Sequence, residues 1–206
     1  MAKLDLKKEY RRLYNPSAKE CSIVDVPEMR FLMIDGAGDP NTSVAYAEAI
    51  EALYAMSYTL TFLSKTAEDV DYVVMPLEGL WWTPDMAEFS TDDKSAWEWT
   101  ALIMQPGHIT AGHVATAIDE VRRKKNPPAL DRIRFEPYRE GLAVQIMYLG
   151  PYAHEAPTIE RLHQFADDSG YQLRGKHHEI YLGDPRRTAP EKLRTVIRQP
   201  VGAPPE

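Results

Sequence analysis

The order strand, helix, strand, strand occurs twice along this chain of 206 residues. Both copies close on the same dipeptide, Gln105-Pro106 in the first and Gln199-Pro200 in the second. The repeat decides the architecture, because a small sheet with one helix leaves its other face bare and needs a partner. We therefore expect an α+β fold of two tandem modules, related by pseudo-two-fold symmetry and facing each other across a central cleft.

The elements of each copy follow from apolar periodicity and from turn residues. Residues 43–63 carry an apolar stripe at helical spacing, and residues 109–125 predict a second helix that Asn126-Pro127-Pro128 ends. The stretch 130–138 alternates only weakly and is interpreted as a connector. The expected organisation is an N-terminal extension at 1–21, a first module at 22–106, a helix and connector at 107–140, and a second module at 141–201.

The net charge of −7 is concentrated in one stretch of the chain. Residues 66–98 hold nine acids against one base, so the remainder is close to neutral. This balance argues against a nucleic-acid binder, which needs a basic face, and it favours cationic ligands. The alternative is that most of these acids lie on a solvated loop. Within the stretch, we expect the polar loop 83–95 to border the cleft.

Cysteine usage and hydropathy indicate the cellular compartment in which the protein works. The single cysteine, Cys21, cannot form an internal disulfide, which favours a reducing compartment. The first residues lack the apolar core of a signal peptide, and no apolar run approaches the length that spans a bilayer. We expect a cytoplasmic protein with no membrane contact and no obligate protein partner. The chain has no zinc-ligand spacing and no phosphate-binding glycine loop, so we expect no metal and no cofactor.

Alternation along residues 177–182 separates the two faces of a strand. His177, Glu179 and Tyr181 share one face, and we expect Ile180 and Leu182, on the other, to pack under the helix. Glu179 should then point into the cleft, where a carboxylate is costly unless it is paired or serves a ligand. The alternative is a structural salt bridge from Glu179 to a nearby arginine or lysine.

Aromatic residues gather near a second strand glutamate, Glu78. All four tryptophans lie between residues 81 and 99. They are either core anchors, the commoner fate, or flat walls for ring stacking and cation–π contact. Two tyrosines, at 148 and 152, end the strand that opens the second copy. The residues expected to bind a ligand are Trp82, Trp97, Trp99, Tyr152, Tyr181 and His177, and those expected to carry chemistry are Glu179, Glu78 and Tyr148.

These patterns resemble the stand-alone GyrI-like proteins. The resemblance covers roughly residues 20–201 and rests on Pro76-Leu-Glu-Gly-Leu-Trp81, on Gly150-Pro151-Tyr152, and on His177-His-Glu-Ile-Tyr-Leu-Gly-Asp-Pro185 followed by Lys192-Leu-Arg-Thr-Val-Ile-Arg-Gln-Pro200. It implies two facing modules around a drug-binding cleft. In relatives fused to DNA-binding domains a strand glutamate pairs with cationic aromatic drugs, and Glu179 matches that position. The first 20 residues cannot hold a helix-turn-helix, so this chain departs from the transcription factors.

Three functions would use the same cleft. Some stand-alone members hydrolyse cyclopropane-bearing, DNA-alkylating natural products, which implies a role in xenobiotic protection. In such a hydrolase Glu179 would activate water as general base, Glu78 could share that role, and Tyr148 or Tyr181 would stabilise the developing oxyanion. The second function is sequestration of a cationic aromatic compound, with Glu179 as its counter-ion. The third, like that of some relatives, is inhibition of a topoisomerase.

Overall fold

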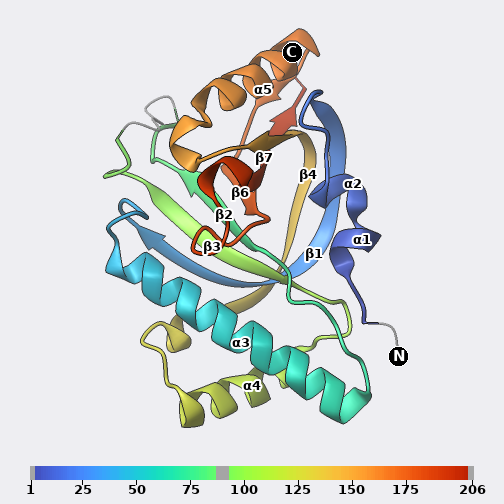
Figure 1. Cartoon of the computed structure of the whole chain (residues 1–206), viewed down its shortest axis with the longest axis vertical. Helices are drawn as coiled ribbons and strands as arrows, with labels where there is room; N and C mark the ends of the chain where they lie inside the picture. Colours follow the sequence, from blue (N-terminus) through green and yellow to red (C-terminus); the bar gives the residue numbers. More distant parts are fainter. Residues whose placement is uncertain (1–2, 87–92, 204–206) are drawn as a thin grey trace.

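A closed antiparallel sheet forms the centre of the computed structural model, which describes residues 3–86 and 93–203 (Figure 1). Its hydrogen-bonded order is β4-β1-β3-β2-β6-β7, and β4 also pairs with β7, which closes the ring into a barrel. A short strand adds to the edge of β7. The strands are β1 (Ser22–Ala37), β2 (Leu77–Trp82), β3 (Glu98–Gln105), β4 (Arg134–Leu149), β5 (Gln172–Leu173), β6 (His177–Tyr181) and β7 (Arg194–Gly202).

The two halves of the chain contribute strands in the same order. The first half supplies β1-β3-β2 and the second supplies β4-β7-β6. The halves join edge to edge, through β2 with β6 and β1 with β4, in place of the two separate facing sheets that we expected. Joining in this way satisfies backbone groups that two small sheets would leave exposed at their edges.

The stretch expected as a connector belongs to the sheet. β4 begins at Arg134, and its first half pairs with β1, Pro137 lying opposite Arg30. Proline is tolerated there because this part of β4 has a partner on one side only, since the β4–β7 pairing starts at Ala143. The weak alternation of 130–138 therefore belongs to a partly solvated edge of the sheet.

Helices cover the outside of the barrel. α3 (Val44–Glu68) begins after Ser43, whose hydroxyl oxygen accepts a hydrogen bond from the Tyr46 amide at 3.2 Å, and it packs on β1 and β3. α4 (Ala111–Lys124) packs beside α3 (Figure 1). α5 (Ala156–Asp168) lies over β4 and β7, where Ile159, Leu162 and Ala166 meet Val144, Ile146 and Ile197. The N-terminal helices are α1 (Leu6–Glu9) and α2 (Arg11–Tyr14), and short 3₁₀ turns span Leu130–Arg132, Tyr152–His154 and Pro190–Lys192.

Register decides which side chains face the barrel interior. Gly79 pairs with Glu179, so Glu179 faces outward, toward the helices. Glu78 pairs with Ile180, and both face the interior. Our expectation that Ile180 packs under a helix is therefore wrong. Because the sheet closes on itself, Ile180 is buried on the concave side of the sheet, inside the barrel. Among residues 3–86 and 93–203, no helix has the length and apolar character required to cross a membrane.

Candidate functional site

A groove of about 1200 Å³ opens on the outer face of the barrel above the β2–β6 pairing. This space is called the groove. One wall is α3, which contributes Tyr46 and Tyr54. The opposite side is formed by Tyr152 and Glu155 at the start of α5, and by residues 182–187. Both halves of the chain thus line one space.

Glu179 lies on the floor of the groove and is buried. Its Oε1 is 3.0 Å from His177 Nε2, and its Oε2 accepts a hydrogen bond of 2.8 Å from the Tyr181 hydroxyl. Burial alone would raise the pKa of Glu179, but the hydrogen bond and charge of His177, aided by Tyr181, outweigh it and hold the pKa below its usual value. Glu179 is therefore ionised at neutral pH.

A second carboxyl group, Glu155, adjoins the first. Glu155 is buried, lines the groove, and is close enough to Glu179 to share a hydrogen bond with it. Burial, and then the negative charge of Glu179, raise the pKa of Glu155 to about 9. At neutral pH the pair therefore holds one proton, on Glu155. Two adjacent carboxyl groups whose pKa values are pushed apart are suited to act as acid and base.

Aromatic rings surround the carboxyl pair. The Trp81 ring centroid is 5.5 Å from that of Tyr46 and 5.2 Å from that of Trp97. Trp81 Nε1 donates a hydrogen bond of 3.1 Å to the Tyr181 hydroxyl, and the Tyr181 ring meets Tyr152 edge to face at 5.4 Å. These contacts fix the rings before any ligand arrives, so the groove presents rigid, flat apolar surfaces next to a charged group.

In the described part of the chain, no cluster of three or more histidine, cysteine, aspartate or glutamate side chains is placed to hold a metal ion.

Residues 19–201 match the family of GyrI-like small molecule binding domains. The chain belongs to this family. A conserved protein of Listeria innocua superposes on this GyrI-like chain with a TM-score of 0.90, at 39% identity, covering 97% of this chain and 100% of that one. A hydrolase from Listeria innocua superposes with a TM-score of 0.87, at 38% identity, covering 98% and 100%.

More distant structures share only the fold of this GyrI-like chain. The C-terminal domain of EcmrR superposes with a TM-score of 0.55 at 13% identity, covering 90% of this chain and 98% of that one. No curated protein sequence matches the chain.

Four residues predicted from the sequence line the groove of the GyrI-like domain: Glu179, Tyr181, Tyr152 and Trp97. His177, predicted with them, contacts Glu179 directly. Strand alternation was sufficient to group His177, Glu179 and Tyr181. The loop 83–95 reaches the groove through Lys94, whereas its residues 87–92 lie outside the described part of the chain.

Three other predicted residues lie elsewhere on the GyrI-like barrel. Trp99 is fully buried beneath Tyr46, with ring centroids 4.9 Å apart. Trp82 donates a hydrogen bond of 2.7 Å to Glu98 and has the Lys176 ammonium 3.2 Å from its ring centroid. Tyr148 packs in the apolar cluster under α5, and its hydroxyl donates to the Pro151 carbonyl at 2.9 Å. None of the three is among the described residues that line the groove.

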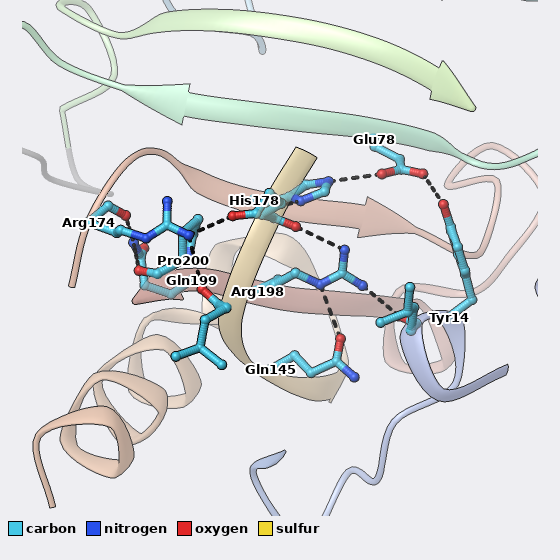
Figure 2. Close-up of polar contacts among 11 residues, drawn as sticks. Tyr14, Glu78, Gln145, Arg174, His178, Arg198, Gln199 and Pro200 are labelled. Atoms are coloured by element: carbon cyan, nitrogen blue, oxygen red, sulfur yellow. Dashed lines mark hydrogen bonds and ion pairs between the residues drawn. The ribbon is translucent and has the colours of Figure 1, made fainter. Parts of the chain in front are cut away.

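Glu78 faces the barrel interior and belongs to a buried network (Figure 2). It accepts a hydrogen bond of 2.7 Å from the Tyr14 hydroxyl and lies 2.9 Å from His178 Nε2. His178 Nδ1 is 2.9 Å from Glu140, which also pairs with Arg198 at 3.1 Å. The sheet therefore separates Glu78 from the groove.

Sequence reasoning did not identify Glu155, Tyr46 or Trp81 as site residues. Glu155 directly precedes α5, where an acidic residue is ordinarily explained by the helix dipole. Tyr46 lies in the first turn of α3, far in sequence from the other groove residues. A usable signal existed for Trp81, since it lies two residues from Gly79 and so shares the outward face of β2.

Proposed function

We propose that this GyrI-like protein hydrolyses flat aromatic molecules held in the groove, with Glu179 as the general base. One observation carries the proposal: Glu179, on the floor of an aromatic-walled groove, adjoins the buried carboxyl group of Glu155, whose pKa is raised to about 9. The hydrolase of Listeria innocua, 38% identical over nearly the whole chain, supports the same reaction class.

Cyclopropane-bearing aromatic natural products are the substrates that we propose. In such a compound a spirocyclopropane is conjugated to a dienone. Glu179 takes a proton from water while the water oxygen bonds to a cyclopropane carbon. The ring carbon–carbon bond breaks, and its electron pair moves through the dienone to the oxygen, which takes the proton of Glu155 to become a phenol. The product is the substrate plus one water, and a proton passing from Glu179 back to Glu155 restores the resting pair.

The other groove residues hold the substrate and the water. The rings of Trp81 and Tyr152 stack on a flat substrate and keep it close to the water. Tyr181 orients Glu179 through its hydrogen bond. Destroying such compounds in the cytoplasm would protect the cell, and this is the biological role that we propose.

The test is turnover by wild type and by Glu179→Gln, which keeps the shape of the side chain and removes its charge. We expect wild type to add one water to a spirocyclopropane dienone, measured by mass spectrometry. Turnover by Glu179→Gln should fall by about 100- to 10,000-fold while the substrate still binds. Glu51→Gln, a change on the α3 side of the same groove, is the matched control and should retain turnover.

Either of two results would contradict the proposal. Full turnover by Glu179→Gln would show that Glu179 is not the general base. Tight binding by wild type with no gain of water would favour sequestration of the aromatic compound instead.

A further inference from the structure

We infer that Lys94 is a built-in counter-ion of the groove, so that the groove selects uncharged aromatic ligands over organic cations. The inference rests on the proposed function and narrows its substrate class. A carboxylate among tryptophan and tyrosine rings is the usual arrangement for binding an organic cation. In this chain the ammonium of a lysine from the protein itself, Lys94, already lies over one of these rings.

Lys94 is held over the groove by the turn that precedes β3. The Trp97 amide donates a hydrogen bond of 3.2 Å to the Lys94 carbonyl, and the Gly38 amide donates one of 2.7 Å to the Trp97 carbonyl. The Lys94 ammonium lies over the Trp97 ring, 4.7 Å from its centroid. Both side chains line the groove, and Lys94 is half-buried. The ring face that an external cation would use is therefore covered.

The charge of Lys94 reaches both carboxyl groups. It lowers the pKa of Glu155 and of Glu179, acting against their burial. Glu155 holds its proton at neutral pH, so Glu179 is the one ionised carboxylate of this pair, and the charge of Lys94 acts on it from within the protein. On its other side Glu179 contacts His177 at 3.0 Å, whose hydrogen bond and charge also lower the pKa of Glu179 and add no negative charge to the groove. An organic cation entering this space would add an unbalanced positive charge, whereas a neutral ring adds none.

The arginines at the rim do not take the same role. Arg186 and Arg187 line the groove, but their side chains are 83% and 88% exposed. Asp184 pairs with Arg186 at 3.1 Å and lies 3.8 Å from Arg187. Exposed, paired charges are screened by water and salt and contribute little to ligand selection.

The experiment compares two probes of one ring system on three proteins at pH 8. N-methylacridinium carries a permanent positive charge, and acridine is neutral at that pH. Binding is measured by fluorescence for wild type, for Lys94→Met and for Lys125→Met. The last variant removes a positive charge from another part of the groove lining and is the matched control.

We expect wild type to bind acridine more tightly than N-methylacridinium. Lys94→Met should shift the affinity ratio toward the cation by on the order of tenfold, and Lys125→Met should leave it within about twofold. An unchanged ratio in Lys94→Met, with both probes bound, would overturn the inference alone. Failure of both probes to bind wild type would overturn the groove as a ligand site and the inference with it. A lack of hydrolysis would contradict only the proposed reaction, since these measurements involve no turnover.

Discussion

At the scale of single residues, the main feature is the unequal pair of carboxyl groups in the groove. Glu179 has the support of His177 and Tyr181, whereas Oε2 of the buried Glu155 has no hydrogen-bond partner among the residues that the structure describes. This difference in hydrogen bonding, together with burial and the mutual repulsion of two negative charges, places the shared proton on Glu155. The assignment of acid and base in the proposed reaction depends on it.

The variant Glu155→Gln should therefore lose the general acid, which is Glu155 itself, and keep the general base, Glu179. We expect turnover to fall by about 100-fold or more, because glutamine cannot supply a proton. Wild-type turnover should decline as pH rises through about 9, since the active form of Glu155 is the protonated one. Turnover measured from pH 6 to 10 should show this decline in wild type and in Glu160→Gln, an exposed control on α5. A decline that persists unchanged in Glu155→Gln would assign it to another group.

The two glutamates also show what sequence can reveal at this scale. Glu179 was predictable because strand alternation is local and its neighbours His177 and Tyr181 lie two residues away. Glu155 was not, because its burial against Glu179 arises only when the start of α5 closes over β6, and no pattern near residue 155 records that contact.

At the scale of elements, β2 places Trp81 over the groove floor by means of a glycine. Gly79 stands directly opposite Glu179 in the register of β2 and β6. A Cβ atom at position 79 would lie only 2.7 Å from Cε2 and Nε1 of Trp81. The missing side chain thus lets the indole ring lie against the backbone, within hydrogen-bonding distance of Tyr181.

Gly79→Ala should displace the Trp81 ring and disturb the groove. We expect the affinity for acridine to fall on the order of tenfold, and the protein to be destabilised by about 1–3 kcal/mol through overpacking. Fluorescence titration and thermal unfolding measure the two effects. Gly107→Ala is the control, because a Cβ there meets nothing within 4 Å. Unchanged binding in Gly79→Ala would mean that Trp81 does not contact the ligand.

Predictions of elements succeeded where an element has one buried face and one solvated face. The apolar stripe of 43–63 marked α3, which extends to Glu68. The first half of β4 was missed because Pro137 and the charged residues around it suit a partly solvated edge and obscure the period of two.

At the scale of the whole molecule, the barrel interior contains charges that balance one another. Glu78 and Glu140 face His178 and Arg198, and Tyr14 of α2 completes the network. Burial alone would lower the pKa of His178, but the two carboxylates outweigh it and raise the pKa to about 9. Burial alone would raise the pKa of Glu140, but His178 and Arg198 hold it at about 2.

Stability should follow these pKa values. The folded-state pKa of His178 is raised, so its contribution is complete below its unfolded value near 6.5 and is lost as pH rises through about 9. The pKa of Glu140 is lowered, so its contribution is present above its unfolded value near 4.5 and is lost as pH falls toward about 2. The free energy of unfolding in urea should therefore be highest between about pH 4.5 and pH 6.5, where both contributions are present. An unfolding free energy that is as large at pH 10 as at pH 6 would contradict the role of His178.

The interior network also explains why Glu78 was predicted as a cleft residue. Alternation sorts a strand into two faces but does not say which face becomes concave when the sheet closes. That choice depends on the pairing of β4 with β7, a contact between segments about 50 residues apart. A glutamate on the inner face and one on the outer face look alike in sequence.

The position of the groove floor has a consequence for amide hydrogen exchange. β2 is hydrogen-bonded on both sides, to β3 and β6, and β6 likewise lies between β2 and β7. Their amide protons should therefore exchange only when the whole protein unfolds. Within the described part of the chain, the backbone of residues 182–187 has no such double partner. A bound molecule should slow exchange of the strands uniformly, because it raises the free energy of global unfolding. In this wall it should also suppress local opening, so the local footprint of a ligand would appear beside Glu179 and not at it.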